Sequence, residues 1–198
     1  MEASKIMAKA RTHLMLRQPF FGSLALRLNL IEDESIPTMC TDGKCIKYNP
    51  DFVQMHQIDE IEGVIAHEVM HVAMCHHLRQ GDRSHEKWNV ATDYAINLVV
   101  VDSGLTLPES GLMDRQYEGL AAETVYARLP DEELPEEGGS WDFGSVAQAT
   151  GEDGSALTES EVRAAEEEVQ IAVLQAHQAA KAAGKEPAGI AGLIKEMS

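Results

Sequence analysis

The chain is poor in basic residues and in cysteine, and each shortage excludes a class of protein. Lys and Arg number 16 against 33 Asp and Glu, which gives a formal net charge of -17 over 198 residues. Such an acidic surface repels polyanions, so we expect no nucleic acid and no anionic membrane among the partners. Three cysteines are an odd and small number, which argues against a disulfide framework and for a reducing compartment.

Long apolar runs are also missing. No uninterrupted apolar stretch approaches the roughly 20 residues that span a bilayer. The first 20 residues carry Lys and Arg and lack the apolar centre of a secretory signal. Hydrophobic residues nevertheless make up 44% of the chain, which is ordinary for a globular domain. The sequence therefore predicts a soluble cytoplasmic protein with a real core.

Hydrophobic periodicity predicts an α+β domain in which helices surround one small sheet. The expected helices cover residues 3–16, 58–78, 85–102, 121–129 and 158–183, with a last short helix after Pro187. Strands are expected over 24–30 and on both sides of Asp42-Gly43, where a two-residue hairpin would place Cys40 opposite Cys45.

Composition divides this single domain into three parts. Residues 1–130 form the expected core. The stretch 131–157 holds eight acidic residues, no basic ones and five glycines, so we expect an acidic flexible loop. Residues 158–198 are expected to be a C-terminal helical extension of the same domain, beginning with Thr158 and Glu161 as a capping box.

The helix expected over 58–78 carries His67-Glu68-Val69-Met70-His71, the pattern H-E-x-x-H. Residues four apart share one helix face, so both imidazoles can reach one zinc ion. Zinc lowers the pKa of a bound water to about 7, and Glu68 could take the proton of that water. The alternative is a pair of buried structural histidines beside a chance glutamate, which costs about 1–3 kcal/mol for each polar group left unpaired.

A catalytic zinc needs a third protein ligand, and His77 is one candidate. It follows His67 by ten residues, but the pattern with that spacing has glycine where this chain has Met74. Nothing in residues 72–75 favours a break, and a continuous helix would carry His76 and His77 away from the ion. We therefore expect these two histidines to cap the helix or to be solvated.

Asp93 is the other candidate for the third ligand. Asn89, Asp93 and Asn97 are spaced four residues apart and form a polar row on an otherwise apolar helix. A carboxylate embedded in such a helix needs a partner, which a zinc ion opposite would supply. The alternative partners are Arg79 and Arg83. We favour Asp93 as the third ligand.

These residues resemble a family of metallopeptidase domains that often lie N-terminal to a von Willebrand factor A-like domain. The similar segments are His67-Glu68-x-x-His71-Val72-Ala73, His76-His77-x-Arg79, Trp88-Asn89-x-Ala91-x-Asp93-x-x-Ile96-Asn97, Gly104-Leu105-x-Leu107-Pro108 and Glu123-x-x-Tyr126. The resemblance implies a zincin-like fold, with a small sheet packed on helices and the H-E-x-x-H helix at the centre. This chain ends where family members continue into the VWA-like region, so we expect a protein partner to replace that region.

The function we expect is zinc-dependent hydrolysis of a peptide or protein substrate. Zn2+ would bind His67, His71 and Asp93, and Glu68 would be the general base and acid. The alternative is a non-catalytic, zinc-stabilised module for protein interaction, although such a site would gain nothing from a free Glu68 carboxylate.

Three further features have weaker support. Residues 44–48 precede the motif helix and are a candidate edge strand for an extended substrate. Tyr48 and Tyr117 are candidates for stabilising an oxyanion, but we expect both to be packing residues.

Overall fold

The computed structural model describes residues 1–130, 144–151, 153–187 and 189–190. The described elements, in chain order, are α1 (Ala3–Arg17), α2 (Pro19–Ala25), β1 (Asn29–Glu32), β2 (Met39–Thr41), β3 (Cys45–Tyr48), α3 (Pro50–Met55), α4 (Ile58–Ala73), α5 (His76–Arg79), α6 (His85–Asp102), a 3-10 turn (Arg115–Tyr117), α7 (Ala122–Arg128) and α8 (Glu159–Ala182). The predicted α+β class is confirmed. The short helix expected at the C-terminal end lies outside the described residues.

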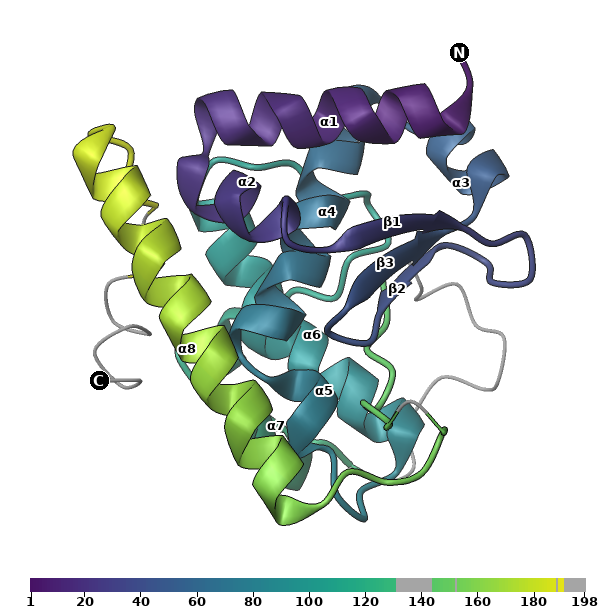
Figure 1. Cartoon of the computed structure of the whole chain (residues 1–198), viewed down its shortest axis with the longest axis vertical. Coiled ribbons are helices and arrows are strands. Elements are labelled where there is room, and N and C mark those ends of the chain that lie inside the picture. The colour runs from purple at the N-terminus through teal and green to yellow at the C-terminus, as the bar shows by residue number, and fades with distance from the viewer. Residues whose placement is uncertain (131–143, 152, 188, 191–198) are drawn as a thin grey trace.

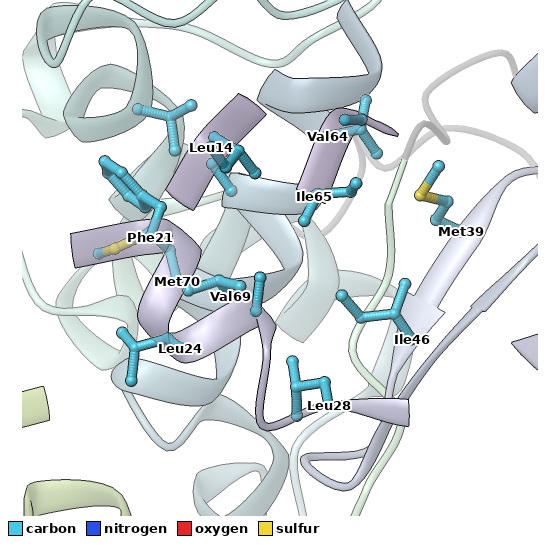
Figure 2. Packing of buried hydrophobic residues seen from close by; sticks show 14 of the residues in the cluster. Leu14, Phe21, Leu24, Leu28, Met39, Ile46, Val64, Ile65, Val69 and Met70 are labelled. Atoms are coloured by element: carbon cyan, nitrogen blue, oxygen red, sulfur yellow. The ribbon is translucent and has the colours of Figure 1, made fainter. Parts of the chain in front are cut away.

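Helix α4 runs through the middle of the molecule (Figure 1). Helix α1 crosses one end of it, the small sheet flanks it, and α8 runs along the outside. Figure 2 shows the apolar side chains that join these elements, with Val64, Ile65 and Val69 of α4 among Leu14 and Phe21. All five are fully buried. The first part of α4 is therefore fixed by ordinary apolar packing.

The sequence predicted several helices closely, and their ends have the expected caps. Helix α6 has the predicted bounds, and the hydroxyl of Ser84 accepts a hydrogen bond from the Lys87 backbone at its start. Thr158 and Glu161 form the predicted capping box of α8. None of the described helices combines the length and the apolar character that crossing a bilayer requires.

The strand expected over 24–30 is wrong for most of its length. Residues Pro19–Ala25 form helix α2, and β1 begins only at Asn29. Proline is favoured in the first turn of a helix, and Phe20 and Phe21 both turn into the core from this helix. Burial of these two rings therefore favours a helix here, although the alternating apolar residues that follow them favour a strand.

The sheet has the strand order β1-β3-β2, with β1 parallel and β2 antiparallel to β3. The hairpin differs from the predicted one, because Cys40 lies opposite Lys47 and not opposite Cys45. The Asp42 carboxylate accepts hydrogen bonds from the backbone of Lys44 and Cys45, at 2.8 and 2.9 Å, which widens the turn. The register moves by two residues, so each side chain keeps its face of the sheet.

Gly63 is the residue of α4 that permits the closest approach of another segment. A Cβ atom at this position would overlap the Thr106 carbonyl group, which lies in the segment after α6. We expect Gly63→Ala to lower the free energy of unfolding by about 1–3 kcal/mol, as overpacking does elsewhere. Alanine in place of an uncrowded helical glycine would instead raise it by roughly 0.5–1 kcal/mol. Urea denaturation measures the sign, and a more stable variant would contradict this packing.

Candidate metal centre

Three polar side chains converge between α4 and α6, and they are the three that the sequence suggested as ligands. The Nε2 atoms of His67 and His71 lie 2.9 Å apart. The Asp93 Oδ1 atom lies 3.6 Å from the Nε2 of His67 and 3.3 Å from that of His71. All three residues are buried, and one donor atom from each falls within 4.8 Å of the others. This group has the composition and spacing of a metal site.

The ring of His67 is held by a hydrogen bond on the side away from this group. Its Nδ1 lies 2.7 Å from the Oδ1 of Asn97, and the amide nitrogen of Asn97 donates to the Leu112 carbonyl at 2.9 Å. The amide oxygen must then face His67, so the ring donates its Nδ1 proton. Its Nε2 atom is left with a free electron pair directed at the site, as metal ligation requires.

His71 is held in a similar way by a third histidine. Its Nδ1 lies 3.0 Å from the Nδ1 of His76, which is itself buried. Burial lowers the pKa of His67 to about 4 and that of His71 to about 3, and a neighbouring imidazole adds to each effect. Both rings are therefore neutral near pH 7, which is the form that binds metals.

Glu68 lies beside the group and is fully buried. Within the described residues neither carboxylate oxygen has a hydrogen bond of good geometry, and the Ser145 backbone N–H is the group near enough to interact with it. Burial, followed by the charge of Asp93, raises the pKa of Glu68 well above its usual value, and the nearby Ser145 backbone N–H opposes this shift. A buried carboxylate without a partner is costly, and a cation and a water molecule in the site would offset that cost. The residues present therefore fit a bound metal.

The motif helix ends earlier than predicted, so the expectation of one helix over 58–78 is wrong. Helix α4 stops at Ala73, and Cys75 has a left-handed backbone with φ 54° before α5 begins. Side chains hold the turn from both sides. The Arg79 guanidinium, which is paired with the distant Glu123, donates to the Met74 carbonyl at 2.8 Å, and the Trp88 indole donates to the His76 carbonyl at 3.2 Å. These bonds fix the carbonyl groups on either side of Cys75, where no glycine favours a left-handed backbone.

This break changes the position of the two histidines that follow. We expected His76 and His77 to be capping or solvated residues, but both are buried. His76 turns inward to His71. The His77 ring packs against Gly43 and is not part of the converging group of His67, His71 and Asp93. His77 lies outside that group although the helix breaks near Met74, the condition under which it could have joined it.

The alternative partners suggested for Asp93 are engaged elsewhere. Arg79 forms a two-bond pair with Glu123, at 2.5 and 3.0 Å. The guanidinium of Arg83 lies over the Trp88 ring, 5.2 Å from its centre.

The two tyrosines lie in packing or surface contacts. The ring of Tyr117 packs on Tyr94 at 4.8 Å between ring centres. The Tyr48 hydroxyl donates to Glu32 at 3.5 Å.

Residues 144–149 cross the open side of the site, and we name them the covering segment. The Thr41 backbone donates to the Ser145 carbonyl at 3.0 Å, and Ala147 donates back to the Thr41 carbonyl at 2.8 Å. Strand β3 is central, so the edge suggested at residues 44–48 is wrong. The outer strand is β2, and the covering segment pairs with it.

The covering segment also corrects part of the flexible loop expected over 131–157. Val146 is 1% exposed and packs with Trp88 and Ala122. Its backbone N–H donates to the Asn89 side chain at 3.1 Å. An apolar anchor and backbone pairing therefore order residues that composition alone suggested were loose. Residues 131–143 lie outside the described residues.

The sequence did not identify the two residues that orient His67 and His71, and only one of them could have been inferred from it. Asn97 belongs to the polar row of α6, so its place beside the site could have been inferred from its spacing to Asp93. His76 gave no such signal, because its inward turn depends on the break at Cys75. Gly144 of the covering segment is also adjacent to the site and carried no recognisable pattern.

Two imidazoles and a carboxylate that converge beside a second buried carboxylate define a candidate metal centre. Residues 2–198 match the family described as "putative metallopeptidase domain", and the chain belongs to this family. No curated protein and no solved structure gives a significant match.

The geometry predicts which side chains a metal requires. We expect Asp93→Ala to weaken zinc binding by more than about 100-fold, because it removes a donor and the only charge of the group. Asp93→Asn should fall between this variant and wild type, since an amide oxygen coordinates without charge. His77→Ala is the matched control and should change the affinity little. Competition with a zinc chelator measures all three, and a larger loss in His77→Ala would contradict the assignment.

A second prediction concerns the residue that orients His67. We expect Asn97→Ala to weaken zinc binding by about 10–100-fold without removing a ligand. Asn97→Asp should restore part of the loss, because a carboxylate still accepts the Nδ1 proton of His67. The same chelator assay applies, and wild-type affinity in Asn97→Ala would show that the hydrogen bond does not orient the ligand.

Proposed function

We propose that the protein is a zinc-dependent peptidase with a zincin-like arrangement of its site. The observation that carries the proposal is the buried Glu68 carboxylate, which lies beside His67, His71 and Asp93 without a described hydrogen-bond partner. A structural metal site gains nothing from an additional uncoordinated carboxylate, whereas hydrolysis of a peptide bond needs a base at this position.

The donor set supports zinc as the metal. His67 and His71 would each offer Nε2, and Asp93 would offer a carboxylate oxygen, which leaves a position open for chemistry. When bound, zinc polarises a substrate carbonyl and lowers the pKa of a coordinated water. The hydrogen bonds from His67 to Asn97 and between His71 and His76 hold both rings in the orientation that this role needs.

Glu68 has the proton-transfer role in this proposal. Its carboxylate accepts a proton from the attacking water as the new C–O bond forms at the peptide carbonyl. It then delivers that proton to the amine nitrogen as the C–N bond breaks, so the base is regenerated. The positive charge of a metal ion held by His67, His71 and Asp93 would favour the ionised form of Glu68 and so offset the effect of burial on its pKa.

One observation favours a second candidate, a non-catalytic zinc-stabilised interaction module. The covering segment lies over the site, so a substrate could not reach a metal held there while this segment is in place. In that case the metal would join α4 to α6, and Glu68 would have no function. We favour the peptidase because it gives the buried Glu68 carboxylate a function beside the metal group, which the interaction module does not.

Glu68→Gln separates the two candidates. Glutamine has nearly the same shape but cannot accept the water's proton, so we expect unchanged zinc content and a loss of hydrolysis of at least about 100-fold. Elemental analysis and cleavage of a fluorogenic peptide library measure the two quantities on the same preparations. His67→Ala is the control that should lose both. Equal hydrolysis by Glu68→Gln and wild type would exclude the proposed role of Glu68.

A further inference from the structure

The outer edge of β2 is occupied by a part of the same chain. Residues 145–147 are parallel to β2 at Thr41 and exchange two backbone hydrogen bonds with it. An open strand edge beside a site is a surface on which proteins bind extended peptides through the same kind of bonds. The covering segment therefore uses the backbone groups that an incoming peptide would need.

Gly144 brings the backbone of this segment directly onto the reacting groups. A Cβ atom at Gly144 would lie 2.5 Å from the Glu68 Oε1 and 2.5 Å from the His67 Nε2. These are the atoms to which the proposed function gives proton transfer and metal binding. The Gly144 peptide group thus stands where the peptide bond of a substrate would have to come.

The attachments of the covering segment are of a kind that a second peptide could replace. Besides the two bonds to Thr41, the Val146 N–H donates to Asn89 and the Ala149 N–H donates to the His77 carbonyl at 2.8 Å. Val146 supplies the buried apolar anchor of the segment, whereas Gln148 is exposed. Each backbone bond would be available to another extended chain with a small apolar side chain at the position of Val146.

We propose that the covering segment is an internal pseudosubstrate that keeps the site latent, and that an extended peptide substrate takes its place on β2. The proposal rests on the proposed function for the identity of the substrate. The claim that an external peptide can replace the covering segment on β2 is separate, because it concerns binding and holds whether or not the site hydrolyses the peptide.

The test is whether weakening the internal segment opens the edge to the same sequence supplied from outside. The probe is a fluorescent peptide, Gly-Ser-Val-Ala-Gln-Ala-Thr, which copies residues 144–150. We expect the full-length Val146→Asp variant to bind it at least about 10-fold more tightly than wild type, since affinity scales with the fraction of open molecules. Gln148→Asp adds the same charge at an exposed position and should bind like wild type. Fluorescence anisotropy measures the binding.

A second variant guards against a folding defect in Val146→Asp. Gly144→Ala leaves the apolar anchor intact and places a methyl group against Glu68 and His67, so it should displace the segment and raise peptide affinity in the same direction. Circular dichroism checks that each variant is folded. If both folded variants bind the peptide with wild-type affinity, the proposal is overturned, and the covering segment is a fixed part of the fold.

A hydrolysis assay on the same variants keeps this proposal distinct from the proposed function. Faster cleavage of library peptides by Val146→Asp than by Gln148→Asp supports both proposals. Tighter peptide binding without any hydrolysis supports the pseudosubstrate and counts against the peptidase. Equal hydrolysis and equal peptide binding in all variants supports the peptidase alone.

Discussion

The burial of polar groups on α4 is the constraint that organises the rest of the structure. His67, Glu68 and His71 have no exposed surface, and apart from Glu62 the other buried residues of this helix are apolar or glycine. Such groups are tolerated only when a partner is supplied from elsewhere. Helix α6 supplies it through Asp93 and Asn97, so the pairing of α4 with α6 is a chemical requirement as well as a packing one.

The turn after α4 shows how the surroundings can impose a backbone that the local sequence disfavours. A left-handed residue other than glycine costs roughly 1–3 kcal/mol, and Cys75 adopts this conformation. Arg79 and Trp88 offset the cost by bonding the carbonyls on either side of the turn. The result is that the His76 ring reaches the His71 ring and fixes its orientation.

The covering segment gives the site its fourth contributor along the chain, after α4, α6 and the turn at residues 74–76. The polar row of α6 begins at Asn89 because that side chain accepts a hydrogen bond from the Val146 backbone, whereas Asp93 and Asn97 contact His71 and His67. The polar row of α6 thus contacts both the converging histidines and the covering segment. The covering segment therefore pairs with the sheet and also lies against the converging side chains.

Local pattern in the sequence was enough for features that depend on neighbours within a few turns. The bounds of α6, the cap of α8 and the alignment of His67 with His71 follow from helical spacing, and Asp93 follows from the cost of an unpaired carboxylate. Contacts between residues far apart in the chain decided the break at Cys75, through Trp88 and the Arg79–Glu123 pair, and the approach of Gly144 to the site. The hairpin register was decided locally, by the Asp42 carboxylate and the backbone of Lys44 and Cys45. Hydrophobic periodicity carries no information about which polar side chain will bond which backbone group, or about which distant backbone will meet a given side chain.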